Sequence, residues 1–168
     1  MPLRLLNNPA TDVVAMAALK QVIVPNTQLA LGSSDSTGLS RVYINTVYPL
    51  SIADFPSVLI SSKPQTYTQC SRSTYNGLVD ISIAYYDRWD KQPQTLDQVY
   101  ANVALDLERM RANIESNDRA VIGGFTAIER IQRIIVSPYY GELDHSIPDV
   151  PLVVRTLTLR CVLPEYDA

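Results

Sequence analysis

The chain has 168 residues, of which 46% are apolar and 18% are charged. This length and composition fit one domain, residues 1–168, whose core is large enough to need no metal or disulfide staples. The 14 Lys and Arg residues against 17 Asp and Glu give a formal net charge of -3. That balance argues against a dedicated nucleic-acid binder, which would carry a basic face or tail.

The cysteine and histidine counts exclude two further classes. Two cysteines, Cys70 and Cys161, are too few for a disulfide-rich secreted scaffold, and with the single His145 they are too few for a four-ligand zinc site. The longest apolar run, residues 13–19, covers about a third of the roughly 20 residues that a membrane-spanning helix needs. Polar residues and Pro9 interrupt the place where a signal peptide would be apolar. We expect a soluble protein made in a cytoplasm, with no membrane contact.

The first predicted element is a helix over residues 9–23. Asn8 suits its N-cap, Pro9 its first position and Asp12 its first turn, where the helix dipole favours an anion. Apolar residues recur along it at mostly three- and four-residue spacings, which predicts one buried face. Residues 31–40 are rich in Gly, Ser, Thr and Asp and predict a mobile loop.

Four strands are predicted next. Residues 41–48 and 57–61 are rich in β-formers, and residues 65–72 are polar with β-formers, as in an exposed strand. Residues 79–86 alternate apolar with mostly polar side chains, so we expect one face on a core and the other largely polar. Residues 87–93 predict a turn.

A long amphipathic helix is predicted over residues 95–116. Thr95 and Gln98 have the spacing of a capping box. One continuous apolar stripe follows: Leu96, Val99, Tyr100, Val103, Leu107, Met110 and Ile114. Five polar residues are expected to lie off this stripe: Asp106, Glu108, Arg109, Arg111 and Asn113.

The last part of the chain predicts two strands and a loop. Residues 127–136 fit either a helix or a strand; their β-branched content and Pro138 favour a strand. Residues 137–151 predict a second mobile loop. Residues 153–163 alternate as a final strand, with Arg155 in phase with the apolar set. Strands on both sides of one long helix, without βαβ alternation, predict an α+β fold: a mixed, largely antiparallel sheet with the long helix on one face and an N-terminal helix.

No catalytic motif is recognisable in the sequence. The glycines form no phosphate-binding loop, and neither HExxH nor GxSxG occurs. His145 beside Asp144, and Cys70 near Arg72, are the candidates for enzyme chemistry, but a solvated loop histidine and an ordinary thiol explain them better. Cys161 lies on an apolar strand face and is expected to be a small buried hydrophobe. We therefore predict no catalytic residue, no cofactor and no metal.

Aromatic residues near loops suggest a protein interface instead. Tyr and Trp are enriched where protein surfaces meet, although core edges and cross-strand pairs also use them. The candidate interface residues are Tyr67, Tyr86, Trp89, Tyr139, Tyr140 and Glu142.

The order and texture of these segments resemble a known family. The segments are the N-terminal helix, the strand entering at Phe55-Pro56-Ser57-Val58-Leu59-Ile60, the long strand 75–86, the helix 95–116 and a last hairpin that ends with Val153-Val154-Arg155-Thr156-Leu157-Thr158-Leu159-Arg160-Cys161. From about residue 10 to residue 163 the chain is similar to the tail terminator (tail completion) proteins and minor tail proteins of long-tailed bacteriophages.

The resemblance implies a structural, non-enzymatic virion protein. Such proteins form a ring, typically a homohexamer, that caps the head-proximal end of the tail tube, stops tube polymerisation and joins the tail to the head connector. It implies three protein partners: further copies of the chain, the tail tube protein and the connector or neck protein. DNA would pass through the lumen without specific binding. Localisation in the tail or neck of the virion follows, after synthesis in the host cytoplasm.

Three alternatives remain open at the level of sequence. A head-completion or neck adaptor protein would be another structural role. A small enzyme would use Cys70, or His145 with Asp144. A ligand-binding domain would place a pocket between the long helix and the sheet.

Overall fold

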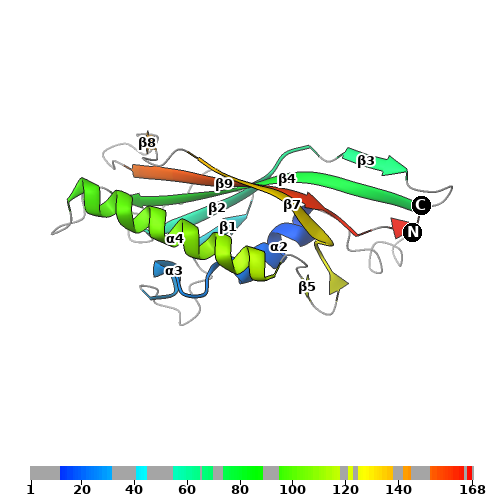
Figure 1. Cartoon of the computed structure of the whole chain (residues 1–168), viewed down its shortest axis with the longest axis horizontal. Coiled ribbons are helices and arrows are strands. Elements are labelled where there is room, and N and C mark those ends of the chain that lie inside the picture. Colours follow the sequence, from blue (N-terminus) through cyan, green and yellow to red (C-terminus); the bar gives the residue numbers. More distant parts are fainter. Residues whose placement is uncertain are drawn as a thin grey trace.

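The structure is a computed structural model that describes residues 12–31, 41–44, 55–64, 66–69, 74–88, 95–117, 121–122, 125–137, 142–144, 152–164 and 166–167. Its architecture is a mixed, mostly antiparallel sheet with helices packed on one face (Figure 1). The predicted α+β class is confirmed.

The main sheet has the strand order β1-β2-β4-β9-β7. These strands are β1 (Val42–Ile44), β2 (Ser57–Ser62), β4 (Thr74–Arg88), β9 (Leu152–Val162) and β7 (Arg130–Val136). The β1–β2 pair is parallel, and the other neighbours in this order are antiparallel. Three further strands pair outside this order: β3 (Thr66–Gln69) and β10 (Tyr166–Asp167) with β4, and β8 (Glu142–Asp144) with β9.

The strands β4 and β9 form the longest antiparallel pair, at the centre of the sheet. Its register runs from Leu78 opposite Val162 to Arg88 opposite Leu152. The predicted alternation is confirmed, because Val79, Ile81 and Ile83 are fully buried. The prediction of a turn from residue 87 is wrong at its start, since Asp87 and Arg88 extend β4 by pairing with β9.

Helix α4 (Leu96–Ser116) confirms the strongest helix prediction. Thr95 is its N-cap, and the capping box with Gln98 is formed in both directions. The predicted stripe is buried or half-buried throughout its length. Asp106 is the exception among the five residues placed off the stripe: it is fully buried. It lies three residues after Val103 and four before Met110, which puts it on the buried side of the helix.

Helix α2 (Asp12–Ile23) packs against α4 and the β2 side of the sheet. The part of the predicted N-terminal helix before Asp12, with Asn8 and Pro9, lies outside the described residues. Between the helices and the sheet lies one large apolar cluster that includes Met16, Tyr85 and Leu107. We call the side of the sheet that contacts α2 and α4 the helix face, and the other side the open face.

The open face is less polar than predicted at one end. Phe55, Tyr86 and Leu152 are buried there in a second, small apolar cluster. Tyr86 belongs to the set of residues 79–86 expected on a largely polar face, and that expectation is wrong at this position. Tyr86 lies opposite Ser57 and Val154 on the two neighbouring strands. Phe55 and Leu152, each two residues before one of these partners, pack with Tyr86 and bury it.

Several short elements were not predicted. Helix α3 (Gln28–Leu31) reaches the start of the expected 31–40 loop, whose residues 32–40 lie outside the described residues. Strands β5 (Val121–Ile122) and β6 (Phe125–Thr126) form a separate two-stranded sheet. The expected 137–151 loop contains β8, because β9 extends past the end of β7 and offers a free edge there.

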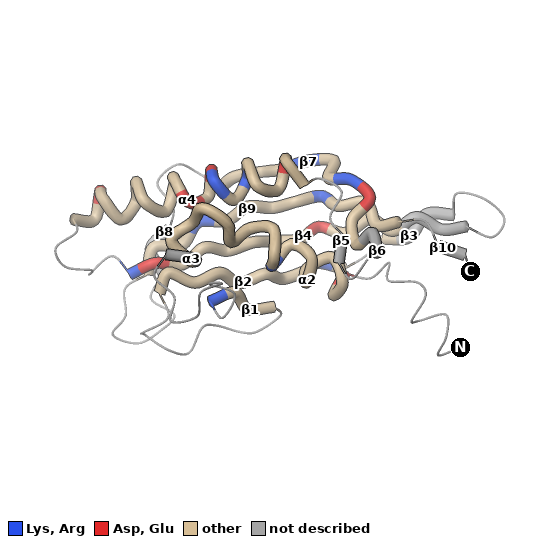
Figure 2. The backbone as a smooth tube through the Cα atoms, turned by 90° about the horizontal axis from the view of Figure 1, so that it is seen from below, with Lys and Arg blue, Asp and Glu red and all other residues tan. Residues whose placement is uncertain are grey.

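The strand predicted over residues 127–136 is confirmed from Arg130 onward as β7. Ala127 and Ile128 precede it as buried residues outside the strand. In Figure 2, seen from below, α2, α3 and α4 lie over the strands, and charged residues are distributed along α4, β7 and the neighbouring strands. None of the described helices has the length and apolarity required to cross a bilayer.

Candidate functional site

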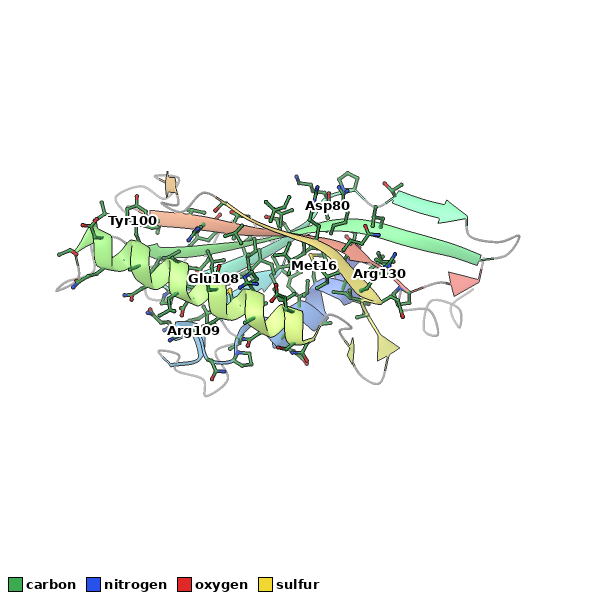
Figure 3. All side chains as sticks on the ribbon, in the orientation of Figure 1. Met16, Asp80, Tyr100, Glu108, Arg109 and Arg130 are labelled. Carbon is green, nitrogen blue, oxygen red and sulfur yellow. The ribbon has the colours of Figure 1, made fainter. Side chains whose placement is uncertain are left out.

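One buried carboxylate joins three elements of the fold. Asp106 on α4 accepts hydrogen bonds through Oδ2 from the hydroxyl of Tyr85 at 2.6 Å and from the backbone N–H of Gln28 at 3.0 Å. Its Oδ1 accepts from Nη1 of Arg109 at 3.2 Å. The arrangement ties α4 to β4 and to the first residue of α3. Figure 3 shows Arg109 extending from α4 on the side of α3.

Local sequence explains why a backbone donor lies at Asp106. After α2, the turn at residues 24–27 is closed by Thr27, whose N–H and hydroxyl both donate to the carbonyl of Val24. Asn26 adopts a left-handed φ of 61°, a conformation that asparagine tolerates well. A second tie comes from Nδ2 of Asn113, which donates to the carbonyl of Pro25 at 2.7 Å. The turn is therefore held against α4 at two places.

The surroundings of Asp106 are unusually charged for a core. Burial, followed by the charge and hydrogen bond of Asp106, raises the pKa of Tyr85 well above its ordinary value; the charge of Asp87 acts in the same direction and Arg41 in the opposite one. Asp87 is buried beside this group on β4. Arg155, opposite Tyr85 on β9, is almost buried and donates through Nη2 to the carbonyl of Ser137 at 3.2 Å.

This cluster is suited to holding elements together. All the contacts given above for the Asp106 carboxylate are to protein donors, and a buried acceptor with its partners in place rigidifies what it joins. The arrangement positions α4, which in turn covers one face of the sheet. We interpret it as a structural junction that holds α4 and the first residue of α3 against the sheet.

Of the candidate residues for enzyme chemistry, the structure describes the side chain of Cys161 only. Cys161 is buried on the helix face, where desolvation raises the pKa of its thiol to about 12. Such a thiol is a poor nucleophile near neutral pH, as the sequence predicted. Cys70 and His145 lie outside the described residues, and Asp144 is described only through its backbone in β8. Among the residues that the structure describes, no group of three or more His, Cys, Asp or Glu side chains could hold a metal ion.

Of the six candidate interface residues, the structure places the side chain of one. Tyr86 is 6% exposed and packs in the small apolar cluster with Phe55 and Leu152. Tyr67 and Glu142 are placed by their backbones in β3 and β8. Trp89, Tyr139 and Tyr140 lie outside the described residues. The role of these six residues in an interface stays a prediction.

The middle of the open face carries an ordered charge pair. Arg160 donates to Asp80 through Nε at 2.9 Å and Nη2 at 3.1 Å, from a position directly opposite on the neighbouring strand. The hydrogen bond from Arg160 is the largest cause that lowers the pKa of Asp80. Around this pair lie short side chains such as Ser82 and Thr158. In Figure 3, Asp80 lies on the side of the sheet away from α4.

Among the described strands, β7 is the one that carries an exposed large apolar side chain. Ile135 is 45% exposed, although it lies in a strand. The neighbouring Ile131, Ile134 and Val136 are only partly buried against the core. β7 is the last strand in the sheet order, so its second edge has no strand partner among the described residues.

Sequence reasoning missed Asp106 and the β7 edge. The signal for Asp106 was its spacing from Val103 and Met110, which places it on the buried side of the helix. The prediction overlooked this spacing because it placed Asp106 off the apolar stripe with the other polar residues. The signal for the edge was the run Ile134-Ile135-Val136, apolar on both faces of a strand. Comparison with known proteins adds no relative: no protein-family model and no curated protein matches this chain.

Proposed function

We propose that this protein is a structural component of a long-tailed bacteriophage virion. In this proposal, six copies of the chain form a ring on the head-proximal end of the tail tube. The ring ends tube polymerisation and presents a surface to the head connector or neck protein. The partners are further copies, the tail tube protein and the connector, and DNA passes through the lumen without specific binding.

The observation that carries the proposal is the arrangement of elements. An N-terminal helix, strands before and after one long amphipathic helix, and a mostly antiparallel sheet with that helix on one face make up the pattern on which the resemblance to tail terminator proteins rests. The Asp106 junction supports it further, because it fixes α4 rigidly on the sheet. A rigid subunit suits a closed ring, in which each head-to-tail contact must repeat with the same rotation.

The test is a phage in which the gene for this chain is disrupted. We expect tails of abnormal length and unattached heads, and restoration of normal particles when the intact chain is supplied in trans. A second arm images the purified protein by negative stain and measures its mass by light scattering at low and high concentration. Closed rings support the proposal.

The outcomes separate the structural alternatives. Tails of normal length beside unjoined heads would indicate a neck adaptor and contradict a terminator. Normal, infectious particles from the disrupted phage would refute a virion role of either kind. A control tests the enzyme alternative: the disrupted phage is supplied in trans with the double variant Cys70→Ser, His145→Ala. If the protein needs neither side chain for chemistry, this variant restores normal particles as fully as the intact chain does.

A further inference from the structure

The two outer strands of the main sheet run in opposite directions. β1 is parallel to β2, and β2, β4, β9 and β7 alternate in direction. β7 is therefore antiparallel to β1 across the sheet. If copies are arranged around an axis along the strands, as in a ring of identical subunits, the β7 edge of one copy meets the β1 edge of the next in antiparallel orientation.

The second half of β7 has outward-pointing backbone groups and apolar side chains, which suit pairing with a further strand. The N–H of Ser137 donates to the carbonyl of Thr156 at 2.9 Å. Because hydrogen-bonded and non-hydrogen-bonded residue pairs alternate along an antiparallel ladder, the backbone N–H and C=O of Ile135 also point toward β9. The backbone N–H and C=O of Ile134 and Val136 point away from β9, toward the open edge. Edge strands of monomers are usually protected by charges or prolines. In β7 such protection is confined to the first half of the strand, where Arg130 and Arg133 are exposed and the register with β9 shifts between Ile131 and Arg133. The second half, residues 134–136, is apolar.

We propose that β7 of one copy pairs with β1 of a second copy of this chain, joining their sheets into one continuous sheet. The pairing places Val42 opposite Val136, Tyr43 opposite Ile135, and Ile44 opposite Ile134. This inference rests on the proposed ring and names the contact that would close it.

Side-chain faces support this register. Val42 and Ile44 share the helix face with Val136 and Ile134, because each is connected through the sheet register to the buried set. Tyr43 and Ile135 share the open face. A shift by one residue would put every one of these side chains on the wrong face. The pairing also covers the exposed Ile135 with an aromatic ring, a stabilising cross-strand combination.

Charge supports the antiparallel direction. Arg41 then comes beside Ser137, about 13 Å along the strand from Arg133 at about 3.3 Å per residue. A parallel pairing of the same apolar residues would place Arg41 next to Arg133. Two like charges opposite each other in a sheet are destabilising.

The proposed pairing implies a stagger between neighbouring copies. Through the register of one copy, Ile44 lies level with Ile60, Ile83, Leu157 and Val136. The proposed pairing moves β1 by two residues from that level, about 7 Å. Closing a sheet on itself requires a displacement of this kind along the strands.

The first test is a disulfide between copies. In a Cys70→Ser background, the variant Tyr43→Cys with Ile135→Cys is oxidised mildly, both as purified protein at high concentration and on phage tails. We expect a ladder of covalent multimers on a non-reducing gel that ends at the ring. The matched control, Leu105→Cys with Ile135→Cys, joins two positions of similar exposure, 49% and 45%, that the pairing keeps apart. Buried Cys161 is inert in both variants.

The second test disrupts the contact. Ile135→Glu places a charge on the exposed position and is expected to abolish ring formation while the subunit stays folded, as judged by its circular dichroism. Leu105→Glu on α4 is the control and should leave rings intact.

The results separate this inference from the proposed function. Rings that form without specific cross-linking, or that tolerate Ile135→Glu, overturn the β7–β1 contact and leave the ring proposal standing. No rings and no multimers, either in solution or on tails, overturn both. A ladder from the test pair that exceeds the control pair supports both.

Discussion

Replacing Asp106 by alanine tests whether the buried junction holds α4 on the sheet. The change removes the acceptor for Tyr85, Gln28 and Arg109. The Tyr85 hydroxyl is then a buried donor without its partner, at a cost of about 1–3 kcal/mol. The Gln28 N–H is only half-buried, so its loss is closer to about 1 kcal/mol. The side chain of Arg109 is 39% exposed, and such pairs contribute at most about 1 kcal/mol.

The sum predicts a loss of about 3 kcal/mol in the free energy of unfolding. That is a large part of the roughly 5–15 kcal/mol by which domains are stable. Urea unfolding followed by circular dichroism measures it, with an unchanged m-value as the sign that the unfolded state is the same. Glu108→Ala is the matched control on the same helix, because Glu108 is exposed and pairs only with Arg111 among the contacts given by the structure. We expect less than about 1 kcal/mol there.

A double-mutant cycle assigns the effect to the Tyr85 contact. Tyr85→Phe removes the donor together with its need for an acceptor, so the double variant should be more stable than the sum of the single losses predicts. The coupling should fall within about 0.5–3 kcal/mol. Additive losses, or an Asp106→Ala loss no greater than that of Glu108→Ala, would refute the junction.

Three further outcomes follow from local features of the fold. Thr95→Ala should lower the free energy of unfolding by about 1 kcal/mol through loss of the α4 cap, and an unchanged urea midpoint would contradict this. Tyr85 has a folded-state pKa raised above 10.0, so its contribution to stability is complete below pH 10 and is lost as the pH rises further. In an ultraviolet titration, the folded wild type and the folded Tyr85→Phe variant should therefore form the same number of phenolates. An additional phenolate in the folded wild type would count against the burial of Tyr85. Asp80 has a folded-state pKa lowered below 3.8, so its contribution to stability is present above that pH and is lost as the pH falls. Asp80→Asn should therefore flatten the pH dependence of the free energy of unfolding below about pH 4. An unchanged pH dependence in acid would argue against the ion pair with Arg160.

Periodic segments were predictable because local pattern and packing agree in them. The capping box and apolar stripe of α4 identify its start and its buried face, and the two-residue alternation of β4 and β9 identifies their shared core face. The fold class follows from the order of these segments. The same pattern misled at Asp106, since a charged residue on the buried side of a helix is only acceptable when distant parts of the chain supply its partners.

The short elements could not be predicted for a related reason. β8 and β10 are only a few residues long and exist because longer strands offer them an edge. Tyr86 is buried because Phe55 and Leu152, distant in sequence, converge on it. Nothing local in these segments distinguishes them from loops or polar faces.

Hydrophobic periodicity and helix capping act over a few residues. The α+β class, the long helix, the central strands and their core-facing residues can therefore be recognised from local pattern. Long-range contacts set the strand order, the parallel β1–β2 pair, the Asp106 junction and the opposite directions of the two sheet edges. These depend on contacts between residues far apart in the chain, such as Gln28 with Asp106 and Asp80 with Arg160. Such contacts leave no spacing in the sequence by which they could be recognised.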